Sequence, residues 1–194
     1  MTPPPAPEPP DSGVADTGAF RDDQVLVEFI LHKFDQLTSI VQELDDAAAN
    51  TELHVPGSNS PVQLLIHCCG AMRRWSSTVN LGVTVPRDRE SEFHVRMPVH
   101  QALEIAEQTR ALFLADTAVT SFDAAPVALP EDRADFWTGS CRGVLLHVLE
   151  EVSQHLGHAE ITRDLLALGR DGEAKLTRRS REDSPRNQHG KEIL

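Results

Sequence analysis

The chain has 194 residues, of which 40% are hydrophobic and 25% are charged, the ordinary composition of a globular domain. Its formal net charge of −12 at pH 7 disfavours binding to nucleic-acid phosphates and to anionic membrane surfaces. No apolar run approaches the roughly 18 to 20 residues of a membrane span, and no signal peptide is recognisable. Three cysteines, two of them adjacent, make a poor disulfide framework, so the predicted location is the reducing cytoplasm.

The two ends of the chain have compositions that do not favour a folded core. Residues 1–19 are rich in proline and nearly free of large apolar side chains, which predicts a disordered arm. Residues 172–194 are charged and polar without an apolar period, which predicts a flexible tail. The remaining residues, 20–171, form one predicted domain that is long enough for a sizeable core.

Four amphipathic stretches predict helices, from about Asp23 to Ala49, Pro61 to Asn80, Pro98 to Ala115 and Gly139 to Leu168. Ser60 marks the start of the second helix, because serine is a favoured N-cap and proline a favoured first helical residue. Gly169 is expected to end the fourth. Strand-like alternation is scarce, apart from short extended pieces at 83–85 and 94–97. The predicted fold is therefore all-α, a four-helix bundle.

The fourth predicted helix carries an unusual polar stripe, made of His147, Glu151, His155 and His158. At about 100° per residue, these four side chains fall within an arc of about 80°. An apolar stripe adjoins them, so the polar stripe is expected at the edge of the core. Imidazole nitrogen and carboxylate oxygen are usual ligands of divalent metal ions, so the pattern predicts a metal site.

A third ligand is expected from another helix, because Glu151 and His155 lie one turn apart and catalytic sites often use three protein ligands. His67 is the best candidate, since it lies at the edge of the apolar face of the second predicted helix. The predicted metal-binding residues are therefore His67, Glu151 and His155. The alternative is that they are buried, hydrogen-bonded polar side chains without a metal.

Two segments resemble the DinB-like superfamily: Leu64-Leu65-Ile66-His67 followed by Trp75, and Glu151 followed by His155-Leu156-Gly157-His158. The most similar branch is the one related to mycothiol-dependent maleylpyruvate isomerases and thiol S-transferases, and the resemblance covers roughly residues 20–170. It implies a DinB-like four-helix bundle that holds a divalent metal, often zinc. By position, the implied ligands are again His67, Glu151 and His155. Many members carry glutamine where this chain has His158, which argues against His158 as a ligand.

Other polar residues near these segments have less specific predictions. His147 is expected to orient Glu151 through a ring nitrogen rather than to bind the ion. For His158, a supporting contact, a substrate-facing position and a place on the helix surface remain alternatives. Trp75 is expected in the core or in a pocket wall. The histidines without a partner at ligand spacing are considered incidental: His54, His94, His100 and His189.

The cysteines and two arginines are expected to have structural or solvated positions. Cys68 is predicted to be a small core residue. Cys141 lies near a helix start, which would lower the pKa of a thiol, but no basic partner is evident. Arg73 and Arg74 are predicted on a solvated face, with the alternative that one binds an anionic group of a ligand.

Three functions from different classes follow from the predicted site. Two imidazoles and one carboxylate leave a divalent ion with a charge of about +1, which favours an anionic fourth ligand. The resemblance implies that this ligand is the thiolate of a low-molecular-weight thiol, so the first hypothesis is a metal-dependent thiol S-transferase that uses a mycothiol-like thiol on an electrophile. Isomerisation of a maleylpyruvate-like double bond would use the same thiolate.

The second hypothesis is a metal-dependent hydrolase in which Glu150 or His158 is the base, and the third is a stress-related bundle that binds metal or a ligand without turnover. Zinc is the favoured ion, while nickel, iron and manganese occupy similar sites. Small-molecule partners are expected, and exposed bundle faces leave room for a homodimer.

Overall fold

The computed structural model describes residues 17–131 and 135–182, and it places side chains within 22–131 and 135–169. All regular secondary structure in these residues is helical, so the segments 83–85 and 94–97 do not form strands. Within the same residues, no helix combines the length and the apolar character needed to cross a membrane. The predictions for residues 1–16 and 183–194 lie outside the described part of the chain.

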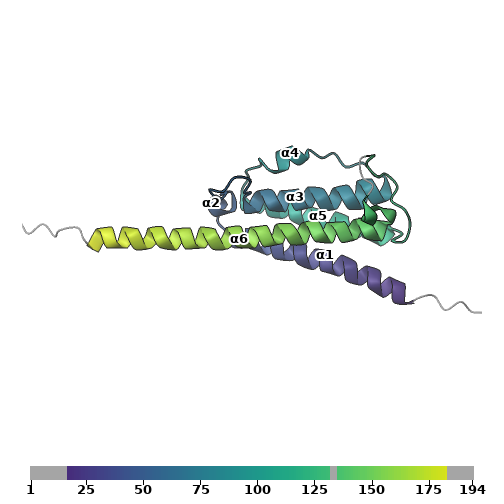
Figure 1. Ribbon diagram of the computed structural model, residues 1–194, viewed down its shortest axis with the longest axis horizontal. Helices are drawn as coiled ribbons and strands as arrows, with labels where there is room; N and C mark the ends of the chain where they lie inside the picture. The colour runs from purple at the N-terminus through teal and green to yellow at the C-terminus, as the bar shows by residue number, and fades with distance from the viewer. Residues whose placement is uncertain (1–16, 132–134, 183–194) are drawn as a thin grey trace, which may run out of the picture.

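Four long helices form the bundle, and short helical segments connect them (Figure 1). The elements are α1 (Thr17–Glu43), α2 (Asp46–Ala49), α3 (Pro61–Arg73), the π-helix η1 (Arg74–Asn80), α4 (Arg89–Glu92), α5 (Val99–Val119), the 3₁₀-helix η2 (Phe136–Gly139) and α6 (Cys141–Glu182). Helix α6 packs against α1 and α3, and α5 also packs against both of these helices. The prediction of an all-α helical bundle is confirmed.

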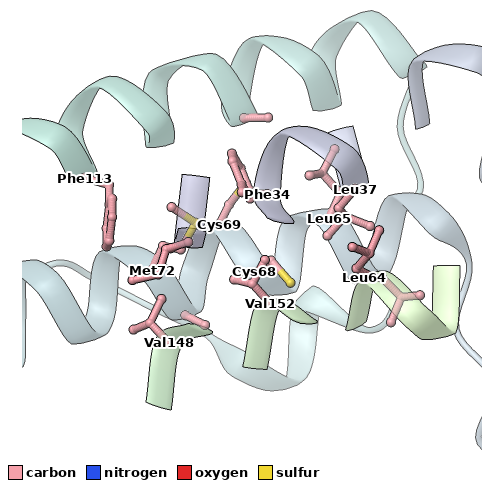
Figure 2. Close-up of a cluster of buried hydrophobic side chains, with 14 of the residues drawn as sticks. Phe34, Leu37, Leu64, Leu65, Cys68, Cys69, Met72, Phe113, Val148 and Val152 are labelled. Carbon is pink, nitrogen blue, oxygen red and sulfur yellow. The ribbon is translucent and has the colours of Figure 1, made fainter. Parts of the chain in front are cut away.

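A cluster of buried apolar side chains forms the core between the four long helices (Figure 2). Phe34 on α1, Leu65 on α3, Phe113 on α5 and Val152 on α6 are each at most 1% exposed. Burying one such side chain contributes about 1.5–3 kcal/mol relative to leaving it in water. This packing fixes α3 and α6 side by side, and the polar stripe of α6 therefore faces α3.

Helix α3 begins as the sequence predicts and then changes its geometry. The Ser60 hydroxyl accepts a hydrogen bond from the Gln63 backbone N–H, and the Gln63 side chain accepts one from the Ser60 N–H. This reciprocal cap fixes the first turn. After Arg73 the chain continues as the π-helix η1, which the sequence pattern does not predict. π-Helical turns occur frequently at functional sites, and η1 begins with Arg74 and Trp75.

The ends of two helices differ from the prediction. Helix α1 ends at Glu43 because Asp45 caps a separate helix, α2, by accepting a hydrogen bond from the Ala48 N–H at 2.8 Å. Helix α6 continues beyond Gly169 to Glu182 and extends past the other helices (Figure 1). A single glycine disfavours a helix by only about 1 kcal/mol, and helix-forming residues follow it. The segment 172–182 is therefore helical rather than irregular.

Candidate metal centre

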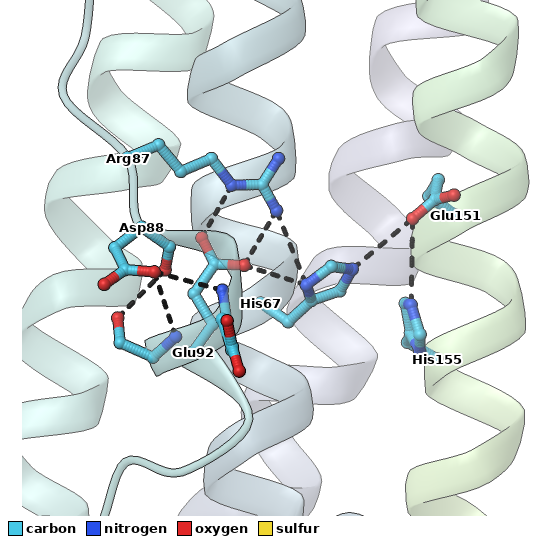
Figure 3. Close-up of polar contacts among 8 residues, drawn as sticks. His67, Arg87, Asp88, Glu92, Glu151 and His155 are labelled. Carbon is cyan, nitrogen blue, oxygen red and sulfur yellow. Dashed lines mark hydrogen bonds and ion pairs between the residues drawn. The ribbon is translucent and has the colours of Figure 1, made fainter.

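The structure brings together the three residues that the sequence predicts as metal ligands. His67 on α3 faces Glu151 and His155 on α6 (Figure 3), and one potential ligand atom from each lies within 4.8 Å of the other two. Oε2 of Glu151 lies 3.5 Å from Nε2 of His67 and 3.7 Å from Nε2 of His155. We call these three residues the triad. Small side-chain rotations would bring the three atoms around a single ion, whose bonds to N and O ligands are about 2.0–2.2 Å long.

The triad histidines carry buried nitrogen atoms without a hydrogen-bond partner. Within the described residues, only three buried side-chain atoms lack a partner, and two of them are Nε2 of His67 and Nδ1 of His155. An unsatisfied buried polar atom costs about 1–3 kcal/mol. A divalent ion beside Glu151 would satisfy Nε2 of His67, so the residues present fit a metal site.

Glu92 and Arg87 lie behind His67 and were not predicted as site residues. Nδ1 of His67 lies 2.9 Å from Oε2 of Glu92, and Arg87 donates to both oxygens of that carboxylate, at 2.6 and 2.8 Å (Figure 3). Burial alone would raise the pKa of Glu92, but the hydrogen bonds from Arg87 and His67 outweigh it and hold that pKa below its usual value. An ionised carboxylate only accepts hydrogen bonds, so Nδ1 of His67 carries a proton. Nε2 is then the nitrogen that can bind an ion.

A short helix and a glycine allow Glu92 to reach His67. Asp88 caps α4 by accepting hydrogen bonds from the backbone N–H groups of Glu90 and Ser91. Opposite α4, a Cβ atom at Gly70 of α3 would lie 2.1 Å from Oε1 of Glu92. A side chain at this position would therefore displace the Glu92 carboxylate from where it lies. This segment lies between the second and third predicted helices, and no periodic pattern there points toward α3.

The charges of the triad depend on one another. Contacts with His155 and His67 hold the pKa of Glu151 far below its usual range, although burial opposes this shift. Burial alone would lower the pKa of His67, but the contacts with Glu151 and Glu92 outweigh it and raise that pKa. Glu151 is therefore ionised at neutral pH and supplies one negative charge to the space between α3 and α6.

Aromatic rings form a wall beside the triad. His147 stacks on Trp137 with ring centroids 4.1 Å apart and meets the edge of Trp75 at 5.2 Å. Nε2 of His147 lies 3.8 Å from Oε1 of Glu151, so His147 is a neighbour of the triad and not a member of it. Trp137 packs closely on α6, because a Cβ atom at Gly143 would lie 2.1 Å from the Trp137 carbonyl oxygen. Trp75 is both a core residue and part of this wall.

A cavity of about 200 Å³ opens beside the triad. Its lining consists of His67, Ala71, Arg74, Trp75, Arg87, Arg89, Pro130, His147 and Glu151. His158 is exposed and does not line this cavity, although its ring centroid lies 5.7 Å from that of His155. The structure thus gives His158 a position on the helix surface. A small molecule in the cavity would contact the open side of an ion held by the triad.

The cysteines, Arg73 and the remaining histidines are not members of the triad. Cys68, Cys69 and Cys141 are buried free thiols, and burial raises the pKa of each, that of Cys69 to about 12. Arg73 is paired with Asp116 and is therefore not simply solvated. The histidines considered incidental that are described, His54, His94 and His100, are exposed and outside the triad, and His189 lies outside the described residues.

Comparison with protein families shows which family the chain belongs to. The family model described as mycothiol-S-transferase matches residues 25–167, a segment that covers most of the four-helix region and includes all three triad residues. Comparison with curated proteins gave no match. Because the family model covers well over half of the chain, the resemblance seen in the sequence is confirmed. The chain belongs to the mycothiol-S-transferase family, a DinB-like branch.

Proposed function

We propose that the protein is a metal-dependent thiol S-transferase, which transfers a low-molecular-weight thiol of the mycothiol type to an electrophile. His67, Glu151 and His155 would hold one divalent ion, and the nitrogen and oxygen donor set favours zinc. The observation that carries this proposal is the buried Nε2 of His67, which makes no hydrogen bond and lies 3.5 Å from Oε2 of Glu151 beside an open cavity. The family to which the chain belongs is described as mycothiol-S-transferase, and this description favours thiol transfer as the reaction.

Each residue around the cavity has a distinct part in this proposal. A bound divalent ion would act as a Lewis acid and lower the pKa of a thiol at its open position. Glu151 contributes a single negative charge, which leaves the site attractive to an anionic sulfur. Glu92 fixes the ring and the tautomer of His67. Trp75 and His147 form the wall against which a co-substrate would pack.

The attacking sulfur comes from the bound thiol and not from the protein. Cys68 and Cys69 are fully buried within the core, and their raised pKa values keep them protonated at neutral pH. In the transfer step, a carbon–sulfur bond forms at the electrophilic carbon. The leaving group departs with its bonding electron pair, and the proton of the thiol passes to solvent.

The proposal is tested by following the loss of a chloronitroaromatic electrophile with the zinc-loaded protein. Consumption above the uncatalysed rate is expected only when mycothiol is present, and a chelator should abolish it until zinc is restored. Ester or amide cleavage without thiol would instead identify a hydrolase. Metal-dependent thermal stabilisation without turnover of any of these compounds would identify a binding protein.

A further inference from the structure

The cavity beside the triad is locally basic in a strongly acidic chain. Three arginines line it, namely Arg74, Arg87 and Arg89, and Glu151 is the only acidic residue among the described lining. The whole chain carries a formal net charge of −12. A basic cavity in such a chain attracts anions locally, although the protein as a whole repels them. An ion held by the triad would increase this local positive charge.

Two of these arginines have no carboxylate partner among the described residues. Arg87 is occupied by Glu92, to which it donates two hydrogen bonds. Arg74 is half-buried, yet it forms no ion pair with any described residue. Arg89 is exposed, and its guanidinium lies 5.5 Å from the centroid of the Phe93 ring without a described ion pair.

Most other described arginines of the bundle are paired with a carboxylate, Arg96 on the exposed surface being an exception. Arg73, next to Arg74 in the sequence, is paired with Asp116, and Arg110 is paired with Asp35. A partly buried guanidinium without a counter-ion loses hydration and gains nothing in return. A ligand anion in the cavity would supply the missing partner of Arg74.

The two arginines reach the cavity from different elements. Arg74 is the first residue of the π-helix η1, and Arg89 is the first residue of α4. A guanidinium presents parallel N–H donors that match the two oxygens of a carboxylate. Two such groups from separate elements can hold a carboxylate in a fixed orientation relative to the triad.

We propose that the electrophilic co-substrate carries a carboxylate, which Arg74 and Arg89 bind while the reactive carbon faces the triad. This inference rests on the proposed thiol transfer and assigns its substrate class. The carbon–sulfur bond forms at that carbon, the leaving group takes its bonding electron pair, and the thiol proton passes to solvent. The carboxylate is unchanged by the reaction and serves only for binding.

A matched pair of electrophiles tests the assignment: 4-chloro-3-nitrobenzoate and 4-chloro-3-nitrobenzamide, each with mycothiol, the zinc-loaded protein and correction for the uncatalysed rate. Arg74→Gln and Arg89→Gln are each expected to lower kcat/KM for the carboxylate about tenfold, since each removes a charge-assisted hydrogen bond. The same variants should lower kcat/KM for the carboxamide much less, since a neutral amide forms no ion pair with a guanidinium. Arg74→Lys should restore part of the lost rate, and Arg96→Gln, which removes an exposed arginine outside the cavity lining, is the control.

The possible failures can be told apart when calorimetry measures binding of the same carboxylate in the absence of thiol. The inference is overturned if kcat/KM is the same for both electrophiles, or if the arginine variants do not change it. The proposed thiol transfer would still stand in either case. If the arginine variants change only the KM of the thiol, the arginines bind the thiol and not the electrophile, and the inference is also overturned. Carboxylate binding that depends on Arg74, without thiol-dependent turnover of either compound, would contradict the proposed function and with it the assignment to an electrophile.

Discussion

Replacing Glu151 with alanine is expected to lower the thiol-dependent kcat/KM by at least about 1,000-fold, since Lewis-acid activation contributes several kcal/mol to a barrier. Glu151 lies between His67 and His155 and supplies the only carboxylate of the triad. Its loss should also remove most of the bound metal. Turnover of an electrophile with saturating thiol is the measurement.

Glu160→Ala is the matched control for this variant, because it removes an exposed acidic residue from the same helix. This control should keep the wild-type rate and metal content. Circular dichroism of both variants would verify that the bundle is folded. A Glu151→Ala protein that is folded and as active as the wild type would show that the triad is not the reaction centre.

Glu92→Gln is expected to weaken zinc binding by about 10- to 100-fold without removing any ligand of the ion. The substitution replaces the ionised carboxylate that accepts from Nδ1 of His67 and from Arg87 with a neutral amide. The amide fixes the tautomer of His67 less firmly than the carboxylate does. It also lacks the negative charge that makes the His67 imidazole a stronger ligand for the metal ion. A competition titration against a chromophoric chelator measures the change.

The control is Glu90→Gln, which removes the same charge from an exposed position on α4. It should bind zinc like the wild type. If Glu92→Gln also retained wild-type affinity, Glu92 would have only a structural role in anchoring α4.

The periodicity of one helix is enough to predict which residues form one side of the candidate site. The spacing of Glu151 and His155 places both on one face of α6, and the adjoining apolar stripe fixes that face at the edge of the core. His67 could be predicted because it occupies the equivalent edge on α3. Both inferences depend only on regular helical geometry, which the packed bundle retains at these positions.

The remaining parts of the site depend on irregular backbone, for which the sequence has no comparable signal. Glu92 reaches His67 through a loop and a four-residue helix, and only the space at Gly70 shows why the contact is possible. Arg74 lines the cavity at the start of a π-helix, whereas a regular helix was predicted through this segment. The extension of α6 beyond Gly169 was missed because an isolated glycine resembles a helix end.

The metal content of the protein, purified without chelator or nickel resin and measured beside a His67→Gln variant, tests the central claim most directly. The account predicts about one zinc ion per wild-type chain, with occupancy far below that in the variant. A wild-type protein that binds no metal even after zinc is added, or a variant with equal occupancy, would contradict it.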